Sequence, residues 1–245
     1  MKPLITALGV CALLLLPAAT YAQVESFTWT GNNGTSTWAE AGNWSGVVPP
    51  EYPGQDDTDD AATVDTDGAN DVLPEYSSGT RTIGTLTIDS DTNAETVSCD
   101  ITGGSLTVGT STTIIGDITH ALTDYHASLT VSGGTFDPAG FYLYGGDPGA
   151  TYHGQARFKL DENGTLTTPD NITVQGDSKF ETEQSVTLSG VTLTVQPDNT
   201  DDYKTEAVVR VVDAGETMSV GTLTIGGANY SSKLTFTGSG SFATN

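Results

Sequence analysis

The chain of 245 residues has only two cysteines, and one of them, Cys11, lies in an apolar run near its start. If that run is removed during export, Cys99 remains alone and no intramolecular disulfide can form. A lone cysteine of this kind is typically a small buried residue. The stability of the fold must therefore come from an apolar core and hydrogen bonds, with bound ions where they are present.

Basic residues are also scarce, because 8 lysines and arginines stand against 31 acidic residues and give a net charge of −23 at neutral pH. Nucleic acids and anionic membrane surfaces bind proteins through basic patches. We therefore expect neither as a partner, and the charge favours binding of cations. Long amphipathic helical patterns are absent as well. Glycine, threonine and turn residues recur at short intervals, which indicates an all-β chain.

The start of the chain has the layout of a secretory signal peptide. Lys2 precedes a short apolar run, Leu4–Pro17, and the small residue Ala22 follows it closely. The run is too short to span a bilayer. The sequence therefore predicts residues 1–22 as a signal peptide, and a secreted protein located outside the cell or at its surface.

A short phrase of alternating apolar and polar residues recurs through the rest of the chain. Its copies are Gly84–Ile88, Gly104–Val108, Ala127–Val131, Gly164–Thr168, Val191–Val195, Gly221–Ile225 and Ser232–Phe236. Neighbouring side chains of a strand point to opposite faces, so each phrase predicts a strand with one apolar face. Such a strand cannot bury that face alone. Repeated copies therefore indicate coils that stack into one core.

The spacing of the phrases predicts a parallel β-helix over residues 81–245. The intervals from Leu86 to Leu106 and from Leu106 to Leu129 are 20 and 23 residues, and one coil of such a helix takes roughly 20–25. The next three intervals are longer, and there we expect loops that leave the coils, whereas the last, of 11 residues, is too short for a coil and predicts a hairpin. Strands at such spacing would also suit a β-sandwich, which is the alternative fold.

The threonines of the phrases would form a regular ladder if every coil had the same length. Ladders of the Thr-x-Thr kind on a flat solenoid face order water, as in ice-binding proteins. Because the intervals between phrases vary, we expect the ladder to lose its register here. Threonine is then only the favoured polar residue of an exposed strand.

Residues 23–80 differ in composition from the repeats. They hold the densest acidic cluster and all three tryptophans, Trp29, Trp38 and Trp44. The end of a stack needs an atypical segment to shield it, so we expect a Trp-rich N-terminal cap here. The three indoles are expected to form the core of this cap, and an aromatic platform for sugar is the alternative.

Two other groups of residues are candidates for contacts. Tyr142 and Tyr144 share one face of a predicted strand and could meet a sugar or a protein partner. Four aspartates could supply oxygen ligands to Ca²⁺, the one cofactor that the sequence suggests. They are Asp56, Asp57, Asp59 and Asp60. Their spacing matches no known calcium loop, and a solvated acidic loop is the alternative.

The order of these features resembles that of a known family. Trp29-Thr-Gly, Gly42-Asn-Trp-Ser, Val48-Pro-Pro and the acidic segment 56–64, followed by Gly-Thr-Leu-Thr-Ile, are similar to secreted bacterial proteins with autotransporter-associated β-strand repeats. The resemblance implies a right-handed β-helical passenger. It also implies an exported protein of the cell surface or the extracellular space, often without assigned chemistry.

No pattern in the sequence singles out a catalytic residue, because it has no nucleophile elbow, no Cys/His arrangement and no phosphate loop. We therefore expect a non-catalytic structural or adhesive solenoid. Its partners would be further copies of itself or a surface polysaccharide or protein. The alternative is a carbohydrate-binding module or a polysaccharide lyase. A lyase needs converging basic residues, and Arg157 and Lys159 are the only close pair in the sequence.

The last residues of the chain, 232–245, keep the rhythm of strands and turns, with no plug after them. Strand edges that are not capped recruit other strands. We therefore expect either that Asn245 is not the natural end of the gene product, or that this end docks onto a neighbouring molecule. Docking of that kind would build an end-to-end filament.

Overall fold

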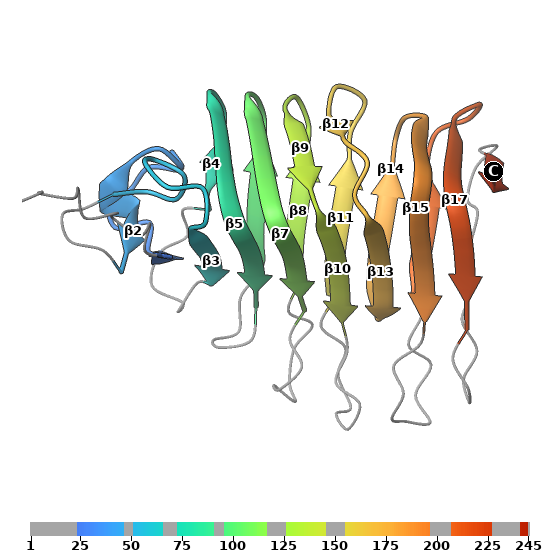
Figure 1. The fold of residues 1–245 in the computed structure, drawn as a ribbon, viewed down its shortest axis with the longest axis horizontal. Coiled ribbons are helices and arrows are strands. Elements are labelled where there is room, and N and C mark those ends of the chain that lie inside the picture. Colours follow the sequence, from blue (N-terminus) through green and yellow to red (C-terminus); the bar gives the residue numbers. More distant parts are fainter. Residues whose placement is uncertain are drawn as a thin grey trace, which may run out of the picture.

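The computed structural model describes residues 24–46, 51–65, 73–90, 96–116, 126–145, 155–196, 207–226 and 241–244. These residues form a β-solenoid, in which strands of successive coils lie side by side and pair in parallel (Figure 1). The predicted all-β class and the solenoid are confirmed. The sandwich alternative is wrong, since its sheets would be antiparallel. The helical structure of the described residues is limited to the short 3₁₀ turn η1 (Ala41–Asn43).

Two sheets, here named A and B, form the walls of the solenoid. Sheet A contains β1 (Ser26–Trp29), β2 (Trp44–Ser45), β3 (Ala61–Asp65), β5 (Thr80–Asp89), β7 (Ser105–Ile115), β9 (Thr135–Pro138), β10 (Gly140–Gly145), β12 (Thr165–Leu166), β13 (Asn171–Gly176), β15 (Val186–Gln196), β17 (Thr217–Ile225) and β18 (Ser241–Thr244). Sheet B contains β4 (Glu75–Tyr76), β6 (Val97–Ile101), β8 (His126–Val131), β11 (Gln155–Leu160), β14 (Ser178–Thr182) and β16 (Val208–Val211). From β3 to β17 the chain passes alternately through sheet A and sheet B. Among the described helices, none has the length and apolar character that a membrane crossing requires.

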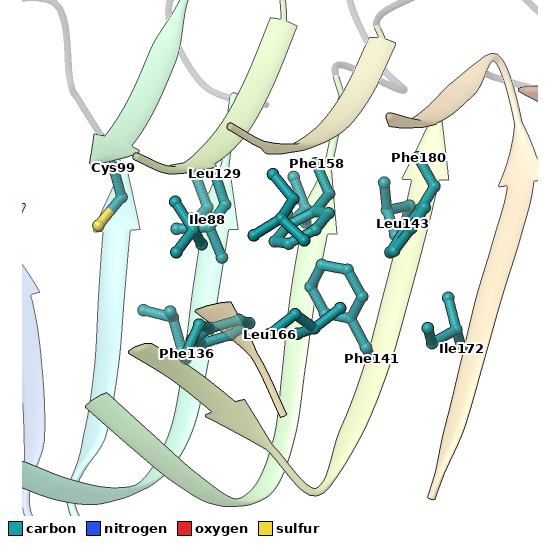
Figure 2. Close-up of a cluster of buried hydrophobic side chains, with 14 of the residues drawn as sticks. Ile88, Cys99, Leu129, Phe136, Phe141, Leu143, Phe158, Leu166, Ile172 and Phe180 are labelled. Carbon is teal, nitrogen blue, oxygen red and sulfur yellow. The ribbon is translucent and has the colours of Figure 1, made fainter. Parts of the chain in front are cut away.

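The core lies between the two sheets and follows from strict alternation along the strands. In β8, for example, the burial alternates residue by residue, with Ala127, Leu129 and Val131 inward. Phenylalanine rings from both sheets meet in the middle of the stack (Figure 2). Cys99 points into the same core, and its burial raises the pKa of the thiol far above the usual range. Cys99 is therefore the small buried residue that the sequence predicted.

The recurring phrase marks strands, but its spacing does not measure the coils. Leu86 and Leu106 are both fully buried, yet they do not stack on each other. Leu86 pairs with Thr112 on the next coil, whereas Leu106 pairs with Phe136. The first phrase lies in the second half of β5, the next in the first half of β7, and the third in sheet B. The interval-based prediction of coil length is therefore wrong, although the inward direction of these leucines is correct.

Coil length, measured between paired residues, varies from coil to coil. It is 31 residues from Phe141 to Ile172, but only 21 from Ile172 to Leu193. The last phrase, Ser232–Phe236, lies outside the described residues. The final strand, β18, pairs in parallel with β17 and so continues the winding.

The tryptophans pack together at the start of the solenoid. Trp29, Trp38 and Trp44 are 1–7 % exposed, and Trp44 meets the other two edge to face, with ring centroids 5.0 and 4.7 Å apart. Nε1 of Trp38 donates to the carbonyl oxygen of Pro53 at 3.2 Å, and Nε1 of Trp44 donates to that of Trp38 at 2.8 Å. Their geometry is that of a cap core. None of the three indoles presents an open face for stacking on a sugar.

The cap is continuous with the solenoid, because its strands β1, β2 and β3 belong to sheet A. Phe27 of β1 pairs with Ala62 of β3, and Ala62 pairs with Leu86 of β5. Both of these strand pairs keep the parallel register of the coils. The residues around β1 and β3 therefore sit on the first two rungs of the same ladder.

Candidate functional site

The outer side of sheet A carries two columns of uncharged side chains, here named the hydroxyl face. One column has a single residue on each rung: Thr28, Thr63, Thr87, Thr113, Tyr142, Thr173, Thr194 and Thr224. The other column, two positions earlier on each strand, comprises Ser26, Ala61, Thr85, Ser111, Gly140, Asn171, Thr192 and Thr222. Strand geometry sets the rungs about 4.8 Å apart and the columns about 6.6 Å apart.

The register of this face survives because the differences in coil length fall outside the two columns, in the connections between strands and in register shifts within β5/β7 and β15/β17. Nine residues, 146–154, connect β10 to β11, whereas Asp177 alone connects β13 to β14. Hydrogen bonds between the parallel strands hold each rung in place, whatever the length of the connection. The expectation that unequal intervals break the threonine ladder is therefore wrong.

Tyrosine interrupts the ladder at one rung. The side chain of Tyr142 is 40 % exposed and lies between Thr113 and Thr173. Tyr144 lies on the same strand face and is half-buried, as the alternation predicted. Beside it, Nε2 of Gln196 donates to Oε1 of Gln175 at 2.8 Å. The two tyrosines therefore stand in a neighbourhood of hydroxyl and amide groups.

Two hollows beside the described strands are small. One, of about 20 Å³, lies beside Trp38 and Tyr76. The other, of about 160 Å³, opens where β12 and β15 do not pair, and neutral residues such as Thr165 and Gln184 line it. Ligand pockets usually span about 300–1,000 Å³. Both volumes are below this range.

The outer side of sheet B gathers basic residues that the sequence left scattered. Arg157 and Lys159 on β11, Lys179 on β14 and Arg210 on β16 lie on three neighbouring strands. They are four of the 8 basic residues of the chain. The three strands lie side by side because β11, β14 and β16 follow one another at intervals of about one coil. The sequence alone does not show this spacing, because it depends on the register of the strands.

Acidic side chains neutralise most of this basic group. Oε2 of Glu181, which is 5 % exposed, lies 2.5 Å from Nε of Arg157, and its Oε1 lies 3.4 Å from Nη1 of Arg210. Nζ of Lys159 lies 2.6 Å from Asp161 and 2.9 Å from Glu183. Hydrogen bonds to these two carboxylates raise the pKa of Lys159. Lys159 is therefore a poor general base at neutral pH.

The four aspartates of the predicted calcium cluster lie in different environments. Asp56 and Asp59 are exposed, and Oδ1 of Asp57 accepts the backbone N–H of Asp59 at 3.2 Å. Asp60 is fully buried, and its Oδ2 accepts the backbone N–H of Gly54 at 2.8 Å. In the described part of the chain, no three metal-binding side chains are gathered around one point.

Burial and neighbouring charges make the ionised form of Asp60 costly. Desolvation is the main cause that raises its pKa, and the negative charges of Asp57, Glu25 and Asp56 add to it, while the hydrogen bond from Gly54 opposes the shift. Its second oxygen, Oδ1, is buried and has no hydrogen-bond partner among the described residues. Asp60 is therefore the member of the cluster that needs a neutralising group.

Comparisons of the chain with protein-family models, with curated proteins and with solved structures found no match. The resemblance to proteins with autotransporter-associated repeats stays a prediction from the quoted residues. Function is therefore inferred from the geometry of the chain itself.

Proposed function

We propose that the chain is a structural and adhesive protein of the cell surface or extracellular space, which contacts a neutral polysaccharide through the hydroxyl face. The observation that supports this proposal is the hydroxyl face itself. It presents two uncharged columns in register on a chain whose net charge is −23. Hydroxyl and amide groups both donate and accept hydrogen bonds, as the hydroxyls of a sugar do. The signal-like layout of residues 1–22 fits this location.

Tyr142 would act as the anchor of such a contact. Its side chain is 40 % exposed, and tyrosine combines an apolar ring with a polar hydroxyl. The neighbouring threonines keep the surroundings flat and neutral. A polysaccharide chain could therefore lie along the rungs, with one of its rings on Tyr142.

Binding of the full chain to an array of neutral and acidic glycans tests this proposal. We expect retention on neutral glycans, and about a tenfold weaker binding for Tyr142→Thr, which corresponds to about 1.4 kcal/mol of lost aromatic contact. Thr173→Lys should weaken binding as well, because it places a charge and a long side chain on the hydroxyl face.

Ser128→Lys is the matched control, because Ser128 is a half-buried residue on the outer side of sheet B. Its binding should equal that of the unchanged chain. An array without any neutral glycan bound, or an equal loss in Ser128→Lys and Thr173→Lys, would contradict the proposal.

The register of the threonines favours a second candidate, the binding of ice. Paired Thr-x-Thr positions recur at rungs such as Thr85/Thr87, Thr192/Thr194 and Thr222/Thr224. The ring of Tyr142 lies over Gly140 of the second column, so it interrupts both columns at this rung. Thermal hysteresis of the unchanged chain would support ice binding, and Tyr142→Thr should then increase it. Tyr142→Thr therefore distinguishes the two candidates, because it should weaken binding to a polysaccharide but strengthen binding to ice.

A polysaccharide lyase has less support from the geometry. A lyase needs a side chain that accepts a proton near neutral pH, and enzymes lower the pKa of a lysine for that purpose. Lys159 has the opposite shift, and the two arginines share the buried carboxylate of Glu181. The basic group on sheet B fits a role in holding the outer sides of β11, β14 and β16 together.

A further inference from the structure

Two carboxylates meet where the first two rungs of sheet A begin. Glu25 and Asp60 directly precede Ser26 and Ala61, which are partners in the ladder of β1 and β3. The backbone N–H of Ala61 donates to the carbonyl oxygen of Glu25 at 2.8 Å. Glu25 and Asp60 therefore occupy equivalent positions on neighbouring rungs. Like charges in such positions repel each other and destabilise a sheet.

Each of these carboxylates has one oxygen that is cut off from water. Oε2 of Glu25 and Oδ1 of Asp60 are buried and find no hydrogen-bond partner in the described ranges. A buried acceptor without a partner costs about 1–3 kcal/mol, and more when it is charged. Ion pairs that join two described residues lie on sheet B, between β11, β14, β16 and their flanking acids. No described lysine or arginine neutralises this pair.

Further carboxylates lie near the pair, although no three of them gather around one point in the described ranges. Burial raises the pKa of Glu51, and the negative charges of Asp56, Glu25 and Asp60 add to the shift. Asp57 is the neighbouring charge that acts most on Asp60, but its Oδ1 already accepts the backbone N–H of Asp59, and Asp59 is exposed. Oxygen is the ligand atom that all of these groups supply. A hard cation is the species that such a set of groups attracts.

We propose that one Ca²⁺ binds between Oε2 of Glu25 and Oδ1 of Asp60, where two buried carboxylate oxygens lack hydrogen-bond partners among the described residues. Ca²⁺ accepts six to eight oxygens in flexible geometry and takes backbone carbonyls and water with carboxylates. Mg²⁺ fits less well, because it demands a near-ideal octahedron and loses water reluctantly. The bound ion joins β1 to β3 and so fixes the cap on the solenoid.

Calcium binding to the full chain, after removal of metal with a chelator, tests the site directly. We expect saturable binding of one Ca²⁺ per chain by isothermal titration calorimetry. At a Ca²⁺ concentration about 100-fold above the dissociation constant, the Tm should rise by about 5–10 °C. Mg²⁺, and Na⁺ at matched ionic strength, should raise it much less.

Three substitutions separate a site from general screening of charge. Asp60→Asn and Glu25→Gln keep the size of the side chain and should abolish the Ca²⁺-dependent rise in Tm. Asp59→Asn removes one charge from an exposed member of the same cluster and should leave the rise intact. In chelator, Asp60→Asn should have a higher Tm than the unchanged chain, because a buried charge is removed; in Ca²⁺ it should have a lower one.

Several outcomes would overturn the proposal. Equal Ca²⁺ effects on Asp59→Asn and Asp60→Asn would indicate screening alone. If the unchanged chain shows no saturable binding of Ca²⁺, the site does not exist. A higher Tm of Asp60→Asn in chelator without Ca²⁺ binding to the unchanged chain would mean that a shared proton neutralises the two carboxylates.

Discussion

Phe158→Ala is expected to lower the free energy of unfolding by about 3–5 kcal/mol, the range for a fully buried phenylalanine. Phe158 of β11 is 0 % exposed. Its ring stacks on that of Phe180 at 4.9 Å and meets that of Phe141 edge to face at the same distance (Figure 2). Both sheets surround the ring, so the cavity left by alanine cannot collapse easily. Urea unfolding followed by circular dichroism measures the loss.

Ser128→Ala is the control for this substitution. Ser128 lies on β8 next to β11, but its side chain faces outward. Surface substitutions of this kind usually change stability by less than about 0.5 kcal/mol. Comparable losses for Phe158→Ala and Ser128→Ala would contradict the assignment of inward and outward faces in sheet B.

Gly176→Ala is expected to cost about 3 kcal/mol or more, because it adds a clash to an unfavourable backbone conformation. Gly176 has a φ of +67° at the corner where Asp177 alone links sheet A to sheet B. A Cβ atom there would lie 1.7 Å from the carbonyl oxygen of Gly145. That oxygen accepts the backbone N–H of Asp177 at 2.9 Å, so moving it away breaks a hydrogen bond.

Gly190→Ala is the matched control, since Gly190 also has a positive φ, +82°, but no atom within 4 Å of an added Cβ. It should cost about 1–2 kcal/mol, which is the price of the left-handed conformation alone. Thermal unfolding of both variants gives the comparison. If Gly176→Ala and Gly190→Ala lose the same stability, the close approach to Gly145 does not restrict this corner.

The sequence predicted strand faces well, because alternation is a local property of the chain. It did not predict the coils, because pairing between strands depends on register over long separations. Thr112 shows why, since it is fully buried and stacks on Leu86 at an inward position. The next leucine of the repeat, Leu106, comes before Thr112 in the sequence and belongs to another part of the coil.

The sequence predicted a candidate site only where its residues lie close together in the chain. The tryptophans of the cap lie close together in the chain, and their burial was expected. Glu25 is 35 residues from Asp60, and no motif connects them; only the pairing of β1 with β3 brings them together. The basic residues of sheet B were missed for the same reason. Arg157, Lys179 and Arg210 are neighbours by register alone.

The parallel ladders also determine how the molecule responds to mechanical force. The strands run across the long axis of the solenoid (Figure 1), so the hydrogen bonds between coils point along it. A pull along this axis opens one ladder at a time, whereas a pull along the strands shears many bonds at once. A coil of 21 to 31 residues extends to about 70–110 Å when it is released. A tether of this architecture lengthens in steps under tension, while the coils that remain closed keep their shape.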